Sequence, residues 1–384
     1  MKKKLQKVLK KGCIPLAIIL VLSMTVGLTG CNGGAGEIKP DGPGVGGPDT
    51  SPDNTGPDVG GPDTSLVNTG KVQNFNLAHF WPSSHPVETE LVQPWIAAVF
   101  EATEGRVKIT SYPGETLIPS AEIYEGVKEG VADIGLSCFS YTRGQFPVLE
   151  VFELPGIVYN DSAAATRIAW EGIRELNPKE VQDTTLMMVF TTGPGHLFTK
   201  NPVRNLGDLK GLEIRATGLS AATLQALGAV PVAMPQAEAY ESISKGIVKG
   251  NLGPTEILKG WSQAEVTNYI TLTPFLYNTL FFFTMNTGKW DKISEKDQQA
   301  ILEINQKFFD EVACSLWDRQ NEEAFAYAVN EKGMEVFELT AEETAIWTGL
   351  VKPVQDDFVS KMDGLGFNGR EILDTVQRLS DKHK

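Results

Sequence analysis

From Asn74 onwards the sequence alternates between short strand-type and longer helix-type patterns, and this alternation restricts the fold more than any other feature. Residues 74–80, 106–112 and 132–137 are typical of strands. Helical patterns at 87–104, despite Pro94, and at 120–128 separate them. Because β-α-β-α-β alternation is typical of mainly parallel sheets with helices on both faces, we predict an α/β fold.

The second half of the chain continues this alternation. We expect strands at 186–192, 269–273 and 280–285, and the run Phe281–Phe283 favours a strand buried on both faces. Ser294–Asp297 forms a capping box, and an apolar stripe then predicts a helix that continues to about residue 330. The stripe consists of Ile301, Ile304, Phe308, Val312 and Leu316. Thr340–Glu343 predicts the start of a further helix, and 371–378 a last one.

The N-terminal segment has the pattern of a secretory signal peptide, with a Lys-rich start and an apolar run at 14–28. Leu28-Thr29-Gly30-Cys31 resembles a bacterial lipobox, which implies acylation of Cys31 and a lipid anchor outside the cytoplasm. The alternative is an uncleaved membrane anchor, although the run is shorter than the ~20 residues of a span. Residues 32–71 are dominated by Gly, Pro, Asp, Thr and Ser, so we expect a disordered linker.

Charge and composition exclude several classes of function. Because residues 1–30 contain six Lys and no acidic residue, their removal lowers the net charge from −14 to −20. Such an acidic protein repels nucleic acid, so we expect no nucleic-acid partner. No HExxH, paired-Cys, phosphate-loop or Gly-x-Ser-x-Gly motif occurs, so we expect no metal, no cofactor and no catalytic residue. Cys138 and Cys314 are expected to be buried thiols rather than a disulfide bridge.

The segment 205–218 holds the strongest candidate for a binding residue. Residues 208–211 predict a turn and 212–216 a short strand, which places Arg215 at the strand end, before an apolar run at 221–227. Ligands of open α/β sheets bind beyond the carboxyl ends of strands, and a guanidinium binds a carboxylate through two parallel hydrogen bonds. The alternative is an exposed Arg215 that pairs with an acidic surface residue.

Leu209-Lys210-Gly211-Leu212-Glu213-Ile214-Arg215 resembles the LKGxxxR signature of substrate-binding proteins of tripartite ATP-independent periplasmic (TRAP) transporters. Residues 105–109, 112–114, 130–135 and 229–240 resemble further segments of that family, so the resemblance covers about 74–384. It implies a two-domain α/β fold like that of periplasmic binding proteins, with mixed sheets, helices on both faces, a ligand cleft between the domains and a long helix that spans both. Residues 72–192 with about 281–332 are then domain I, and 193–280 with about 333–384 are domain II.

The resemblance also implies the binding site. Arg215 is expected to pair with the carboxylate of a small organic acid. The remaining contacts are expected from His79, Trp81, Ser83, Phe139, Tyr141, His196, Met234, Pro235, Gln236, Asn251 and Trp261. Many relatives have a second Arg near the position of His196; its absence here favours a monocarboxylate. Gly253 leaves space for a larger group, such as an aromatic or keto acid.

The predicted function is that of an extracytoplasmic solute receptor, tethered to a bacterial membrane, that delivers an organic acid to the small and large membrane subunits of a TRAP transporter. Two alternatives belong to other classes. One is a lipid-anchored extracytoplasmic hydrolase, and the other is a receptor that senses a solute without importing it.

Overall fold

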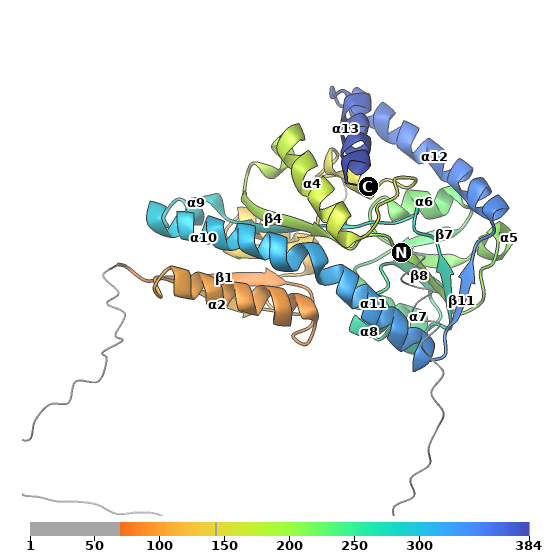
Figure 1. Ribbon diagram of the computed structural model, residues 1–384, viewed down its shortest axis with the longest axis horizontal. Coiled ribbons are helices and arrows are strands. Elements are labelled where there is room, and N and C mark those ends of the chain that lie inside the picture. The colour runs from red at the N-terminus through yellow and green to blue at the C-terminus, as the bar shows by residue number, and fades with distance from the viewer. Residues whose placement is uncertain (1–69, 143, 384) are drawn as a thin grey trace, which may run out of the picture. The chain divides into compact units, whose positions relative to one another are not determined.

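The computed structural model describes residues 70–142 and 144–383, which belong to one compact unit. The predicted signal peptide, Cys31 and nearly all of the predicted linker therefore lie outside the described residues. Two β-sheets, each flanked by helices, make up the described part (Figure 1).

The first sheet has the strand order β2-β1-β3-β10-β4. Its strands are β1 (Gln73–His79), β2 (Val107–Tyr112), β3 (Ile134–Cys138), β4 (Thr185–Thr191) and β10 (Leu280–Met285). β1 pairs in parallel with β2 and β3, as the predicted β-α-β-α-β unit requires, whereas β10 is antiparallel to both β3 and β4. The sheet is therefore mixed, because a strand from far along the chain is inserted between β3 and β4.

Strand β10 shows why three Phe residues occur in a row. Successive side chains of a strand point to opposite faces of the sheet. Phe281 and Phe283 pack in a cluster with α2 (Gln93–Ala102) and α10 (Glu295–Phe308), whereas Phe282 packs with α3 (Ile123–Lys128) and α4 (Ser162–Leu176). Helices cover both faces of the first sheet, so every residue of β10 is buried.

Short helical segments complete this half. They are η1 (Val87–Val92), η2 (Ser120–Glu122), η3 (Phe139–Tyr141), η4 (Leu149–Glu153) and η5 (Lys179–Val181). The helix predicted over 87–104 is a π-helical turn, η1, followed by α2. Pro94 lies in the first turn of α2, directly after η1.

The second sheet has the order β11-β9-β5-β8-β6-β7. Its strands are β5 (His196–Thr199), β6 (Glu213–Ala216), β7 (Val230–Ala233), β8 (Gly250–Gly253), β9 (Tyr269–Leu272) and β11 (Glu335–Glu338). Around it lie α5 (Leu206–Leu209), α6 (Ser220–Ala226), α7 (Gln236–Ser244), α8 (Ile257–Gly260) and η6 (Gln263–Glu265).

The turn predicted at 208–211 is wrong in part. Asn205 caps a helical turn by accepting from the N–H of Asp208, so the chain is helical to Leu209 before it turns.

One helical segment runs from Glu295 to Asn330 through α10, η7 (Phe309–Ala313) and α11 (Cys314–Asn330), after the short α9 (Thr287–Trp290). The Ser294 hydroxyl accepts from the N–H of Asp297 and donates to its carboxylate, as the predicted cap requires. Ile301 and Leu316 pack in the core of the first sheet, and Ala324 packs in a cluster of the second. The predicted long helix therefore contacts both sheets (Figure 1).

The chain ends in α12 (Ala341–Gly364), which Thr340 caps, and α13 (Gly369–Lys382). Trp347 of α12 packs in the core of the second sheet. Ile372 and Val376 of α13 pack in the cluster that holds α4, next to the first sheet. The division into domains stays a prediction, although these contacts place α13 with the first sheet rather than with the predicted domain II.

Cys138 and Cys314 are buried free thiols, as expected.

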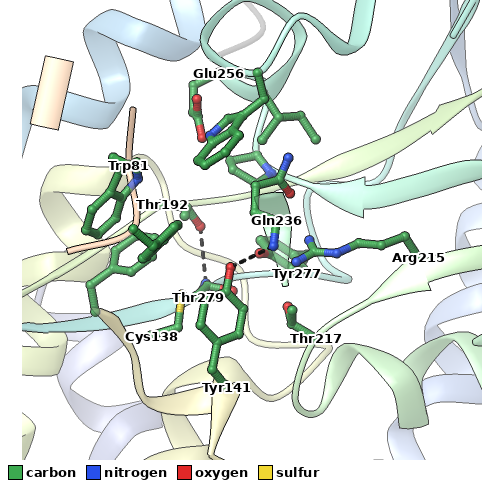
Figure 2. A pocket seen from close by; sticks show the side chains of 15 residues that line it. Trp81, Cys138, Tyr141, Thr192, Arg215, Thr217, Gln236, Glu256, Tyr277 and Thr279 are labelled. Atoms are coloured by element: carbon green, nitrogen blue, oxygen red, sulfur yellow. Dashed lines mark hydrogen bonds between the residues drawn. The ribbon is translucent and has the colours of Figure 1, made fainter. Parts of the chain in front are cut away.

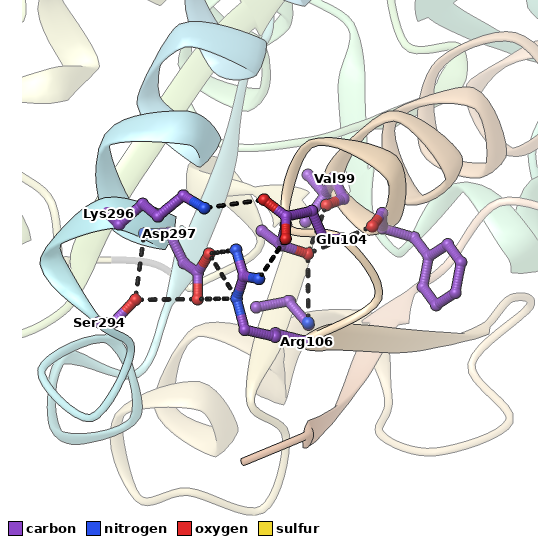
Figure 3. A network of polar contacts seen from close by, with 9 residues as sticks. Val99, Glu104, Arg106, Ser294, Lys296 and Asp297 are labelled. Atoms are coloured by element: carbon purple, nitrogen blue, oxygen red, sulfur yellow. Dashed lines mark hydrogen bonds and ion pairs between the residues drawn. The ribbon is translucent and has the colours of Figure 1, made fainter. Parts of the chain in front are cut away.

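A polar network joins the end of α2 to the start of α10 (Figure 3). Nε and Nη2 of Arg106 donate to Asp297, with a shortest distance of 2.8 Å, and Nη1 donates to Glu104 at 2.9 Å. Lys296 also donates to Glu104, at 2.7 Å. Hydrogen bonds from Lys296 and Arg106 lower the pKa of Glu104 to about 2, and the hydrogen bond from Arg106 lowers the pKa of Asp297.

This network predicts a loss of stability in acid. A carboxyl whose pKa is lower in the folded chain than in the unfolded chain stabilises the fold above the unfolded pKa, about 4, and this contribution disappears as the pH falls. We expect the free energy of unfolding of Arg106→Gln to fall less steeply between about pH 4.5 and pH 2 than that of the unsubstituted chain. Urea unfolding at each pH measures this. Lys245→Gln, which removes an exposed pair with Glu241, is the control, and equal slopes for Arg106→Gln and the unsubstituted chain would contradict the prediction.

Candidate functional site

Arg215 lies near the carboxyl end of β6. Its neighbours Ile214 and Ala216 pack in a cluster with α6, so strand alternation turns Arg215 to the opposite face of the second sheet. There the guanidinium is buried, with 2% of the residue exposed. Its Nε donates to the carbonyl oxygen of Met234 at 3.0 Å, and its Nη1 donates to Oδ1 of Asn251 at 3.4 Å. Neither hydrogen bond involves Nη2.

Within 70–142 and 144–383, no Asp or Glu forms an ion pair with Arg215. The alternative of an exposed Arg215 paired with an acidic surface residue is therefore wrong. A buried charge is costly unless it is paired and hydrogen-bonded. The arrangement favours a bound anion as the missing partner.

A small cavity of about 20 Å³ lies beside the guanidinium. Its walls come from both halves of the described part, and Figure 2 shows Arg215 and Trp81 on different sides of it. The lining residues are Phe80, Trp81, Cys138, Tyr141, Thr192, Arg215, Thr217, Gln236, Pro254, Glu256, Ile257, Trp261, Tyr277, Thr279 and Phe281. This volume is far below the ~300–1,000 Å³ of ligand pockets, so the walls have to move apart to admit an organic acid.

Aromatic rings form much of the apolar wall. The rings of Phe80 and Trp81 are stacked with centroids 3.9 Å apart, and Trp81 meets Phe281 edge-on at 5.2 Å. Trp261, which follows α8, lies nearly parallel to Phe80 at 6.1 Å. Flat rings that line a cavity can stack on a planar apolar group of a ligand.

Polar groups next to Arg215 are positioned by one another. The backbone N–H of Gln236 donates to the hydroxyl of Tyr141 at 3.1 Å (Figure 2), and the side-chain amide oxygen of Gln236 accepts from Asn251 at 3.4 Å. Nε2 of Gln236 is buried and has no hydrogen-bond partner in the described part of the chain. Burial raises the pKa of Tyr141 well above its ordinary value, so its hydroxyl stays protonated. Both side chains therefore offer donors to an anion.

Glu256 is the one acidic residue among the described residues that line the cavity, and Arg215 the one cationic residue. Glu256 is 4% exposed, and Nε2 of His85 lies 3.3 Å from its carboxylate. Its backbone N–H donates to Asn321 of α11, and the amide of Asn321 donates to the carbonyl oxygen of Thr192. The long helix thereby fixes Glu256 in the cavity wall.

Of the residues predicted for the site, Arg215, Trp81, Tyr141, Gln236 and Trp261 line the cavity. Met234 and Asn251 do not line it, but both accept hydrogen bonds from Arg215 and so hold its guanidinium.

The other predicted site residues lie away from the cavity lining. Ser83 is exposed, and Pro235 serves as the N-cap of α7. His79 is hydrogen-bonded to Glu88 at 2.8 Å, and Phe139 packs against Tyr124 and Phe146 in the core.

His196 also lies outside the lining. Its Nδ1 accepts from the N–H of Thr273 at 3.0 Å, and burial lowers its pKa to about 4, so its ring is neutral near pH 7. The space expected beside Gly253 is partly taken by Ile257, whose Cδ1 would lie 3.1 Å from a Cβ atom added at Gly253.

Sequence reasoning missed several lining residues, among them Glu256, Tyr277 and Thr279. Glu256 comes two residues after Gly253-Pro254, which the family resemblance marks as near the ligand, so a check of that segment for acidic side chains would have identified it. Tyr277 and Thr279 lie between β9 and β10, and they reach the cavity only because β10 inserts into the first sheet.

Comparison with known proteins agrees with this arrangement. A family model described as "Bacterial extracellular solute-binding protein, family 7" (DctP) matches residues 77–362. A C4-dicarboxylate-binding periplasmic protein from Rhodobacter capsulatus is 26% identical over 73% of this chain and 86% of that protein.

Two solved structures are similar in fold as well. One is a TRAP solute-binding protein from a marine metagenome, specific for aromatic acid ligands and in complex with metahydroxyphenylacetate. It is 26% identical, has a TM-score of 0.77, and the match covers 82% of this chain and 100% of that one. The other, from Rhodoferax ferrireducens with copurified benzoate, is 26% identical with a TM-score of 0.76, over 81% and 98% of the two chains.

These matches confirm the predicted two-domain α/β fold of periplasmic-binding-protein type. Within the described ranges, no group of His, Cys, Asp and Glu is arranged to hold a metal ion, and no helix has the length and apolarity needed to span a bilayer. The matching proteins bind solutes and are not enzymes. The chain belongs to the DctP family of bacterial extracellular solute-binding proteins, the solute-binding proteins of TRAP transporters.

Proposed function

We propose that this protein is a receptor that binds a small organic acid in the cavity, with the carboxylate paired to Arg215, and delivers it unchanged to the membrane subunits of a TRAP transporter. The observation that carries the proposal is a buried guanidinium with no acidic partner in the described part of the chain. A carboxylate that accepts two hydrogen bonds from Arg215 would supply the missing charge.

The lining favours one class of organic acid. Arg215 is the one cationic side chain among the described lining residues, and Glu256 would repel a second carboxylate. Phe80, Trp81 and Trp261 provide flat apolar contacts. Similar proteins bind metahydroxyphenylacetate and benzoate, which are aromatic monocarboxylates. These features together support an aromatic monocarboxylate as the ligand.

The attachment to a membrane is also part of the proposal. Cys31 lies outside the described residues, and its acylation rests on the resemblance of residues 28–31 to a lipobox. Labelling with radioactive palmitate tests it: the unsubstituted chain should take up the label and Cys31→Ser should not. Equal labelling of both chains would refute acylation at Cys31.

A thermal-shift screen with organic acids, followed by calorimetry, tests the binding function. We expect aromatic monocarboxylates to stabilise the protein, because a ligand at 100 times its Kd adds about 2.7 kcal/mol to the free energy of unfolding. The bound acid should be recovered chemically unchanged at a 1:1 ratio. Stabilisation by dicarboxylates alone would overturn the monocarboxylate assignment, and turnover of the acid would support the hydrolase alternative.

A further inference from the structure

Glu256 has no role in the binding of a simple carboxylate, although it lines the same cavity as Arg215. Figure 2 shows the two side chains entering from different parts of the wall. An acid that only paired with Arg215 would leave the carboxylate of Glu256 buried beside it. A buried carboxylate with incomplete hydrogen bonding is costly, so this residue requires an explanation.

His85 does not neutralise Glu256. The backbone N–H of Val87 donates to Nδ1 of His85 at 3.1 Å, so Nδ1 is an acceptor and carries no proton. The proton of this neutral ring is therefore on Nε2, which donates to Oε2 of Glu256 at 3.3 Å. Within the described ranges, the carboxylate of Glu256 forms no ion pair with Lys or Arg. Among the described residues, Oε2 of Glu256 accepts from His85, and the other carboxylate oxygen is left to accept from another donor.

The backbone around Glu256 holds the carboxylate in this place. A Cβ atom added at Gly260 would lie 2.7 Å from Oε2 of Glu256 and 3.1 Å from Nε2 of His85, so a side chain at this position would displace the pair. The bond from the N–H of Glu256 to Asn321 ties the residue to α11. An acidic side chain fixed in a ligand cavity, opposite an unpaired cation, matches a ligand that has both an acceptor and a donor.

We propose that the cavity selects aromatic acids that carry a hydrogen-bond donor, an ammonium or a hydroxyl group, apart from the carboxylate, and that Glu256 accepts from this donor. The inference rests on the proposed pairing of the ligand carboxylate with Arg215. Arg215 then determines that the ligand is an acid, and Glu256 determines which acids bind. Such discrimination is strong because an acid without the donor leaves a buried polar group unpaired.

Calorimetry with three matched acids tests this proposal on the unsubstituted protein: phenylacetate, 3-hydroxyphenylacetate and 3-(aminomethyl)phenylacetate. We expect at least one of the two donor-bearing acids to bind tenfold or more tightly than phenylacetate. Equal Kd values for the three acids, or tightest binding of phenylacetate, would overturn the proposal. This comparison needs no variant, so it does not depend on whether a substituted chain folds.

Two variants then identify the donor. In Glu256→Gln, the amide oxygen still accepts but the charge is lost, so a preference for the ammonium acid should fall below threefold while a preference for the hydroxyl acid should persist. In Glu256→Leu, either preference should disappear, while phenylacetate should bind at least as tightly as to the unsubstituted chain. A preference that survives in Glu256→Leu would contradict the assignment to this residue.

The outcomes separate this inference from the proposed function. If the acids bind through Arg215 and the donor brings no gain in affinity, the role of Glu256 is wrong and the receptor function stands. If none of these acids binds and the wider screen yields no organic acid, both are wrong.

Discussion

Arg215→Lys should weaken the binding of the organic acid by about 2 kcal/mol or more, close to a thirtyfold increase in Kd. The guanidinium of Arg215 donates hydrogen bonds to Met234 through Nε and to Asn251 through Nη1, and Nη2 takes part in neither bond. A Lys ammonium is a single point of charge on a flexible stem. The ammonium cannot donate to Met234 and Asn251 and at the same time to both oxygens of a carboxylate, as the planar guanidinium can.

Calorimetry with the tightest-binding acid of the screen measures this effect, and thermal unfolding without ligand verifies that the variant is folded. Arg204→Lys is the matched control, because Arg204 is exposed and its guanidinium lies over the ring of Phe337, away from the cavity lining. We expect its Kd to match that of the unsubstituted chain. An unchanged Kd in Arg215→Lys would remove the central contact of the proposed function.

Trp317→Ala should lower the free energy of unfolding by about 3–5 kcal/mol, the usual range for removal of a large ring from a core. Trp317 of α11 is fully buried. Its ring is stacked on Phe281 with centroids 4.9 Å apart and on Phe190 at 5.5 Å, and it meets Trp81 edge-on at 6.2 Å. Since Trp81 and Phe281 line the cavity, we also expect the affinity for the acid to fall.

Urea unfolding gives this free energy. Trp317→Phe is the control, because it keeps an aromatic ring and removes an indole N–H that has no hydrogen-bond partner among the described residues. We expect Trp317→Phe to lose less than half of what Trp317→Ala loses. If Trp317→Ala lowers the free energy of unfolding by less than about 1 kcal/mol, the rings around Trp317 repack to fill its space. Trp317 of the long helix would then not support the cavity wall.

The proposed site depends on one cation and one anion that are both buried and that come from different segments of the second half of the chain. Arg215 is placed by a strand, and Glu256 by the residues just before α8 together with Asn321 of the long helix. Because a strand holds Arg215 and the long helix holds Glu256, the two charged groups have little freedom to move toward one another or toward water. A ligand with complementary groups would therefore meet a prearranged site, which limits the entropy lost on binding.

The sequence by itself determined many of the elements of this protein, and it also determined its family. The caps at Ser294 and Thr340 and the position of Arg215 at a strand end depend on residues close together in the chain, and these predictions agree with the structure. The family motif added the expectation of two α/β halves and a long shared helix, which no local pattern contains.

Only the tertiary structure decided which side chains meet. The Phe281–Phe283 run looked like core alone, yet insertion of β10 between β3 and β4 turns Phe281 toward the cavity. His79, Phe139 and His196 lie in segments with the right pattern, but the packing of neighbouring helices and strands buries them elsewhere. Glu256 gained its importance only when folding brought it into the wall of the cavity that also holds Arg215. Local hydrogen bonding and periodicity fix elements, whereas the lining of a cavity depends on contacts between residues far apart in the sequence, which local patterns do not encode.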